Sequence, residues 1–408
     1  MASRKLRLAT SWYFMGFGIL LIALTGLGLG AAGLWFSVRR NHIDIWAPAY
    51  VRGLVGRSTE AGAGPVHIIL CVADHFEPGW NGATYEEERR RVETWVKHYP
   101  AMASKHRDAD GVFPQHTFFY PAEQYRPEHL EALASLRHKG FGDVEIHLHH
   151  HGDTAEALRR KLVDFKKVLH EKHGLLHLNP QTGEIEYGFI HGNWALDNSA
   201  PDGRYCGVNN ELVVLRQTGC YADFTLPSAP EETQTRKINS IYYALDDPMR
   251  PKSHDTGKDV EVGGNAAGDL MIIQGPLALN WRSRKWGLLP RIENGDLSGD
   301  NPPTPERVDL WVRQHIHVRG RPKWVFVKLH AHGANERHMP VLLGKPMEDM
   351  FSYLEAAYND GLQYCLHYVT AREMYNLIKS AEAGLDGNPH QYRQYRSQTF
   401  GLTAAQTC

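Results

Sequence analysis

The sequence has few cysteines, no excess of charge of either sign and no internal repeat beyond alternating strand-like and helix-like segments. Its five cysteines form no CxxC pair, which excludes zinc-ribbon and thioredoxin-like motifs; they are Cys71, Cys206, Cys220, Cys365 and Cys408. Cys206 and Cys220 could pair in an oxidising compartment, a question that the sequence leaves open. The formal net charge of −1 over 408 residues gives no basis for a general attraction to nucleic acid.

Charged residues are also absent from residues 12–38. At about 1.5 Å per residue, a helix of this length exceeds a bilayer core of roughly 30 Å. Trp12 and Trp35 lie near the two ends, where aromatic side chains favour the membrane interfaces. We therefore predict an uncleaved, single-pass transmembrane anchor over residues 12–38, after a short tail (1–11) and before a tether (39–64). The remaining domain is expected to be periplasmic or extracellular, although basic residues flank the span on both sides and leave its orientation open.

Apolar, strand-like runs alternate with amphipathic segments from residue 65 to about 380, which is typical of a βα-repeat fold. Expected strands begin near residues 66, 116, 143, 187, 220, 270, 324 and 363. Expected helices cover 85–98, 126–138, 154–173, 305–318, 348–359 and 370–378. Residues 230–268 are polar and are expected to form an inserted loop or hairpin that covers a site. A polar tail is expected over 381–408.

Histidine is the residue that the chain has in abundance, with 24 copies, several of them at the predicted ends of strands. In residues 143–153, apolar and polar side chains alternate with the period of a strand, so His147 and His149 project from the same face. Imidazole is the commonest ligand of zinc and related metals. This stretch therefore predicts a metal site.

Other predicted strands end in residues of similar chemistry. The carboxyl ends of the strands in a parallel βα-barrel meet at one mouth, where active sites lie. The residues expected there, besides the pair on the third strand, are Asp74, His75, Glu77, His191, Asn193, Trp194, Asp223, His330 and His332. Their combination predicts a polar site with metal-binding or acid–base side chains.

Several of these pieces resemble, in order and spacing, the motifs of the polysaccharide deacetylase superfamily (carbohydrate esterase family 4 and its relatives). Residues 72–76 resemble its opening Asp-Asp motif, 116–119 its second strand and 145–153 its third, histidine-containing motif. Residues 328–331 and 368–374 resemble its late His motif and its closing motif. The resemblance covers residues 65–380 and implies a distorted (β/α)7–8 barrel of the polysaccharide deacetylase type.

The resemblance also implies a function and a set of roles. The expected protein is a membrane-anchored, metal-dependent hydrolase that removes N-acetyl groups from an exopolysaccharide or cell-wall glycan, with partners in polysaccharide synthesis or export. Asp74 would be the general base and His330 the general acid. A divalent metal, with Zn²⁺ the first choice, would be bound by His75, His149 and Asp153, with His147 as a rival ligand. Six residues are expected to contact substrate: Glu77, His191, Asn193, Trp194, Asp223 and His332.

Departures from the family pattern leave two alternatives. His75 and Asp153 exchange the residue types that the family uses, and Ala331 replaces an aspartate of the late motif. A catalytically inactive glycan-binding or assembly protein would be consistent with these changes. A barrel glycosidase with two carboxylates, Asp74 or Glu77 together with Asp223, would instead cleave the glycan backbone.

Overall fold

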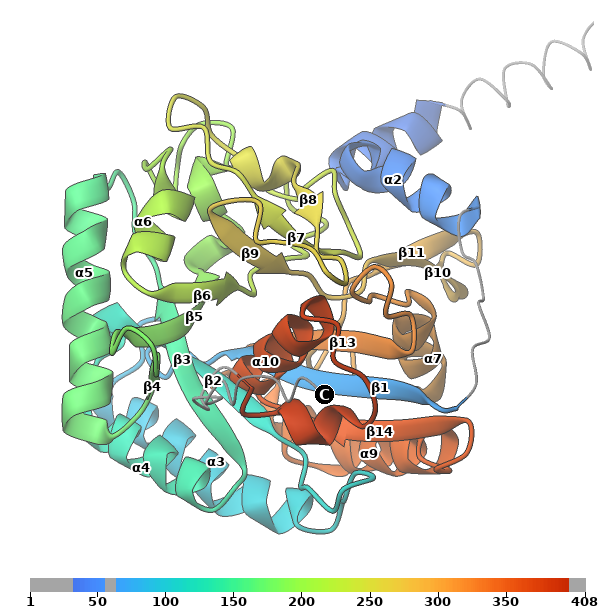
Figure 1. The fold of residues 1–408 in the computed structure, drawn as a ribbon. Coiled ribbons are helices and arrows are strands. Elements are labelled where there is room, and N and C mark those ends of the chain that lie inside the picture. Colours follow the sequence, from blue (N-terminus) through green and yellow to red (C-terminus); the bar gives the residue numbers. More distant parts are fainter. Residues whose placement is uncertain (1–31, 56–63, 396–408) are drawn as a thin grey trace, which may run out of the picture.

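The central feature of the computed structural model, which describes residues 32–55 and 64–395, is a mostly parallel β-sheet flanked by helices (Figure 1). The strands are β1 (Val66–His75), β2 (His116–Pro121), β3 (Gly142–Leu148), β4 (His177–Leu178), β5 (Ile185–His191), β6 (Cys220–Asp223), β7 (Ile241–Ala244), β8 (Lys258–Asp259), β9 (Leu270–Ile273), β10 (Ala278–Lys285), β11 (Leu289–Glu293), β12 (Asp296–Leu297), β13 (Trp324–Ala331) and β14 (Tyr364–Tyr368). The α-helices are α2 (Ile43–Val55), α3 (Tyr85–Ala103), α4 (Pro127–His138), α5 (Ala155–Lys167), α6 (Glu211–Gln217), α7 (Pro305–Arg313), α8 (Met339–Leu342), α9 (Lys345–Tyr358) and α10 (Ala371–Glu382).

The expected α/β class with a mostly parallel sheet is found, but the strands of the described residues do not close into the expected distorted barrel. Its strand order is β12-β13-β1-β2-β3-β5-β6-β9-β7-β8, with β14 also paired to β1 and β4 to β5. From β12 to β9 the strands along this path are parallel, but β7 pairs antiparallel with both β9 and β8. Within the described residues no ladder joins β8 to β12, although one bridge links Glu261 to Arg319. The inserted segment 230–268 therefore supplies antiparallel edge strands where a barrel would need another parallel one.

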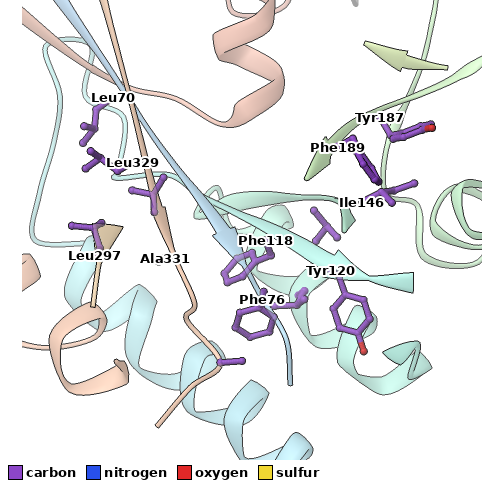
Figure 2. Close-up of a cluster of buried hydrophobic side chains, with 14 of the residues drawn as sticks. Leu70, Phe76, Phe118, Tyr120, Ile146, Tyr187, Phe189, Leu297, Leu329 and Ala331 are labelled. Atoms are coloured by element: carbon purple, nitrogen blue, oxygen red, sulfur yellow. The ribbon is translucent and has the colours of Figure 1, made fainter. Parts of the chain in front are cut away.

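The predicted strands are found because their apolar runs are buried on both faces of the sheet, as parallel strands require. Alternate residues of neighbouring strands form one large core cluster, and Figure 2 shows part of it. Leu70 of β1, Phe118 of β2, Ile146 of β3, Phe189 of β5 and Leu329 of β13 belong to this cluster. Val92 and Trp95 of α3 join the same cluster, so this face of the sheet is covered by the outer helices.

The opposite face of the sheet carries a second core cluster. Ile69, Cys71 and Ala73 of β1 pack there together with Met374 and Ile378 of α10. Because side chains alternate along a strand, His75 continues the series of residues 69, 71 and 73, whereas Asp74 belongs to the face covered by the outer helices. Whether a strand-end residue falls on one face of the sheet or the other therefore determines which of these residues can contact one another.

Threonine caps mark the start of four helices, among them α7, where the Thr304 side chain accepts a hydrogen bond from the Arg307 N–H. The Thr154 side chain accepts a hydrogen bond from the Ala157 N–H and so caps the start of α5. Thr84 and Thr370 form capping boxes with glutamates three residues later, at the starts of α3 and α10. Helix α5 thus starts directly after the histidine-rich loop 149–153 and holds the end of that loop in place.

Of the two forms expected for the insertion 230–268, a loop or a hairpin, the structure has paired strands. The insertion contains β7 and β8, and residues 278–293 form the antiparallel hairpin β10–β11. Residues 383–395 pack on the domain, since the Arg393 guanidinium donates to the carboxylate of Asp108 at 2.8 Å. Within the expected polar tail, residues 383–395 thus lie against the domain, and residues 396–408 lie outside the described part. Cys206 and Cys220 are both free thiols, so the disulfide that the sequence left open is not formed.

The expected transmembrane helix requires a correction. None of the helices in residues 32–55 and 64–395 combines the length and the apolar character needed to cross a membrane. Residues 32–40 are helical, but the rest of the expected span, residues 12–31, lies outside the described residues. The single-pass membrane placement expected from the sequence is not supported.

Candidate metal centre

Five polar side chains converge where β1, β3 and β13 end, and we refer to them as the open group: His75, Glu77, His147, His149 and His332. These strands are close together in the sheet, with β13 beside β1, β1 beside β2 and β2 beside β3. Parallel pairing brings their carboxyl ends to the same edge. The expected convergence of His75, His147 and His149 is therefore found.

Glu77 lies at the centre of the open group. One carboxylate oxygen, Oε1, is 2.9 Å from Nε2 of His149 and 3.6 Å from Nε2 of His147. The other oxygen, Oε2, is 3.0 Å from Nδ1 of His332. Glu77, His147 and His149 each offer a donor atom, and these atoms lie within 4.8 Å of one another. A residue expected to contact substrate therefore has the position of a metal ligand.

His147 of β3 and His149, which directly follows this strand, are each held by a hydrogen bond from Nδ1. Nδ1 of His147 donates to the carbonyl of Ile190 at 2.8 Å, so its Nε2 points toward Glu77 and has no hydrogen-bond partner. Nδ1 of His149 donates to Glu123 at 2.6 Å. Histidines that bind metals commonly make such bonds, to a backbone carbonyl or to a carboxylate, through the nitrogen that is not a ligand.

His75 and His330 complete the inner side of the site. The ring centroid of His75 lies 5.0 Å from that of His147, 4.6 Å from that of His332 and 6.4 Å from that of His330. Nε2 of His75 and Nδ1 of His330 are buried and have no hydrogen-bond partner. Nε2 of His330 is 4.0 Å from the carboxylate of Asp296. These two imidazoles are therefore available to a ligand or to reacting groups.

The charges of the open group are strongly coupled. Burial alone would raise the pKa of Glu77, but the surrounding imidazoles of His147, His149 and His332 hold that pKa well below its usual value. Burial lowers the pKa of His149, yet Glu123 and Glu77 outweigh this and raise it to about 9. For His75, burial and the neighbouring histidines lower the pKa well below its usual value. The group thus contains a fixed carboxylate and at least one neutral imidazole.

Aromatic side chains border the open group. The centroid of the Trp194 ring lies 5.5 Å from those of both His75 and His332, and Trp80, which is 44% exposed, lies 6.1 Å from His332. Asn193 and Trp194 both have positive φ angles, 54° and 52°, which are uncommon outside glycine. Backbone strain of this kind is concentrated at functional sites.

A second set of side chains, the closed group, lies at the ends of β3 and β5: His150, His191, Cys206 and Glu211. Their donor atoms also lie within 4.8 Å of one another, and all four residues are buried. Only His191 was expected at a site, as a substrate contact, whereas the structure turns it away from the open group and toward Glu211. The closed group is thus a second set, besides the open group, that could bind a metal.

Asp74 and Asp153, which the sequence analysis assigned to the reaction and to the metal, have other partners. Asp74 accepts a hydrogen bond from the Gly333 N–H at 2.6 Å and pairs with His116 at 2.8 Å, on the face of the sheet covered by α3. Asp153 is 2.7 Å from Lys161 and 3.4 Å from His150. Asp153 is thus associated with the closed group, and Glu77 provides the carboxylate of the open group.

Other expected contact residues have different surroundings. Asp223 is fully buried and is hydrogen-bonded to the side chain and the N–H of Thr225, and burial raises its pKa to about 7. Tyr221, two residues before Asp223 on β6, is buried and its hydroxyl donates a hydrogen bond to Glu145. Asn193 is exposed beside Trp194. Of these three residues, only Asn193 can contact a molecule from solution.

A third set, Asp108, Asp110 and His367, has the composition of a metal site but is internally satisfied. His367 is bonded through one ring nitrogen to Asp110 and through the other to His67, at 2.8 Å in both cases. Asp108 accepts bonds from Arg393 and from backbone N–H groups. Its donor atoms are therefore already engaged.

Comparison of the sequence with protein-family models and with curated proteins finds no match. The resemblance to the polysaccharide deacetylases therefore rests on the quoted motifs, and the geometry of the site carries the functional argument.

Proposed function

We propose that the open group binds one divalent metal and that the protein is a metal-dependent hydrolase acting on an acetylated glycan. The observation that carries this proposal is the position of the Glu77 carboxylate among the nitrogens of His147, His149 and His332. Nδ1 of His147 carries the proton, because it donates to the carbonyl of Ile190. Its Nε2 is therefore unprotonated and faces the Glu77 carboxylate without a hydrogen-bond partner. Two acceptors that face each other in a buried space favour a cation between them.

The composition of the open group favours Zn²⁺. A set of imidazoles with one carboxylate is a common donor set of catalytic zinc sites, which keep a position open for water or substrate. The side chains of His149 and His332 are 28% and 22% exposed, so the group can be reached from solution. A bound divalent cation would polarise an acyl carbonyl and acidify a water molecule.

Proton transfer is assigned to His330. Its Nδ1 is buried without a partner near His75, and Asp296 lies beside its other nitrogen. We propose that His330 takes the proton of the attacking water and delivers it to the departing amine. Asp74, the base implied by the family resemblance, receives no catalytic role here, because Gly333 and His116 occupy its carboxylate oxygens.

The substrate class rests on the aromatic border. Trp80 and Trp194 lie near His332 on the rim of the group, and sugar rings commonly stack on such indole faces. An N-acetylated glycan would contact these rings while its acetyl group enters the site. The glycosidase alternative is less favoured, because Glu77 is surrounded by imidazoles and Asp223 is buried against Thr225.

The test is metal analysis of the purified chain together with an assay on N-acetylated oligosaccharides. We expect metal-dependent release of acetate with the glycan backbone intact. Shortened oligosaccharides would identify a glycosidase instead. A protein that binds oligosaccharide but releases neither acetate nor shorter chains would be a glycan-binding protein. A metal-free, inert protein would overturn the proposal.

A further inference from the structure

The closed group is the strongest feature that the proposed reaction does not use. It joins the loop after β3, the end of β5 and the start of α6, segments that are separate in the sequence. The side chains of His150, His191 and Glu211 are fully buried, and so is Cys206. Burying an ionised carboxylate is costly unless a compensating charge lies beside it.

The tautomer of His191 explains why the group needs a cation. Its Nδ1 lies 2.5 Å from the carbonyl oxygen of Gly192, which can only accept, so Nδ1 carries the proton. Nε2 then points at Oε1 of Glu211, 3.5 Å away, without a hydrogen-bond partner. Nε2 of His150 lies 3.0 Å from the same oxygen. Two imidazoles thus face one buried carboxylate oxygen.

The other donor atoms are also held in position. Oε2 of Glu211 accepts a hydrogen bond from the Asp197 N–H at 2.6 Å and lies 3.5 Å from Sγ of Cys206. That sulfur accepts the N–H of Val208 at 3.4 Å. Nδ1 of His150 lies 3.4 Å from Asp153, which leaves Nε2 directed at the group. The hydrogen bonds to Glu211 and Cys206 are of the kind that orients ligand residues in metal sites.

We propose that the closed group binds a structural Zn²⁺ ion through His150, His191, Cys206 and Glu211. Two imidazoles, one thiolate and one carboxylate are suitable ligands for this ion, and four protein ligands with no exposed position define a structural rather than a catalytic site. The ion would fasten the loop 150–153 and the strained segment 193–198 to α6. It shares no ligand with the open group, since the consecutive residues His149 and His150 contact Glu77 and Glu211 respectively.

Cobalt replacement of the full chain tests this site through its sulfur ligand. Metal is removed with a chelator and the protein is titrated with Co²⁺, whose bond to a thiolate gives a near-ultraviolet charge-transfer absorption. We expect two bound equivalents, of which one produces this absorption. Cys206→Ser should lose the absorption, whereas Cys220→Ser, a matched buried thiol outside the group, should keep it. Added Zn²⁺ should abolish the absorption and raise the melting temperature of the metal-free protein.

The experiment also separates this site from the open group. Glu77→Gln should bind one equivalent fewer and keep the absorption, whatever its effect on acetate release. No thiolate absorption in the wild-type protein, or an absorption that Cys206→Ser retains, would overturn the proposal. If Cys206→Ser does not fold, the wild-type titration still shows whether a thiolate binds the metal. Retention of the absorption in Cys71→Ser, Cys220→Ser, Cys365→Ser and Cys408→Ser then assigns that thiolate to Cys206.

Discussion

The open and closed groups are built from neighbouring strand ends yet differ in what surrounds them. In the open group, the side chains of His149 and His332 are partly exposed and two tryptophans line the rim. In the closed group, the side chains of His150, His191 and Glu211 are fully buried, and a cysteine is added to the set. Similar sets of side chains can therefore suit a catalytic or a structural metal site. The two groups differ in whether molecules from solution can reach them.

The largest effect is expected from Glu77→Gln, which removes the central charge of the open group. Metal at this group should be lost and acetate release should fall below detection, because the cation and its carboxylate ligand are both missing. Metal analysis should find one equivalent remaining, in the closed group. Loss of both equivalents would show that the two groups are not independent.

His330→Gln should lower turnover by about 10²–10⁴-fold, the usual contribution of a positioned acid–base group. Both metal equivalents should stay bound, since His330 is not assigned as a ligand. The measurements are kcat with an acetylated oligosaccharide and the metal content of the same preparation. Asp74→Asn serves as the control and should retain most of the turnover. An equal loss in that variant, with metal retained, would return the base role to Asp74.

Glu123→Gln should weaken metal binding at the open group by about 10–100-fold, the usual effect of removing a carboxylate that orients a ligand histidine. Glu123 accepts the hydrogen bond from Nδ1 of His149 and lies outside the closed group. Competition with a chelator measures the affinity, and the cobalt–thiolate absorption should not change. Asp153 lies beside Nδ1 of His150 in the same way. Asp153→Asn should therefore weaken metal binding at the closed group and leave metal binding at the open group unchanged.

Asp223→Asn should change the pH dependence of stability without affecting either group. Burial raises the pKa of Asp223 from 3.8 to about 7, so the folded chain holds a proton that the unfolded chain releases more readily. This aspartate therefore lowers stability as the pH rises from about 4 to 7, by at most about 4 kcal/mol. Denaturant unfolding at several pH values measures the free energy of unfolding. Between about pH 4 and 7 this free energy should fall less in the variant than in the wild-type protein. An unchanged decline would contradict the raised pKa.

Much of the fold follows from local patterns in the sequence. The apolar runs at residues 66–75, 116–121 and 324–331 are buried strands, and Thr154 caps the helix that follows β3. The described strands do not close the expected distorted barrel, because segment 230–268 contributes only the short antiparallel strands β7 and β8. Strand pairing over such short segments is decided by tertiary contacts rather than by local sequence.

The site was predictable where strand periodicity applies and unpredictable where loops contribute. The alternation of residues 145–149 correctly brings His147 and His149 together. Glu77 has the same parity as His75, a signal that could have identified it, but the family resemblance directed the choice to Asp153. Cys206 and Glu211 lie 56 and 61 residues after His150 and carry no spacing motif. Folding of the intervening loops alone brings them to the histidines.

Gly192 gives the two groups a shared requirement. A Cβ atom at this position would lie 2.4 Å from Cδ2 of His149, which is too close for any side chain, while its carbonyl fixes the ring of His191. Replacing this glycine by any other amino acid would push apart two loops that must nearly touch. A His-x-His-His run at the end of one strand and a His-Gly dipeptide at the end of the neighbouring strand therefore form a sequence pattern that should identify other chains with both groups. Chains that carry both should also preserve a cysteine and a glutamate downstream.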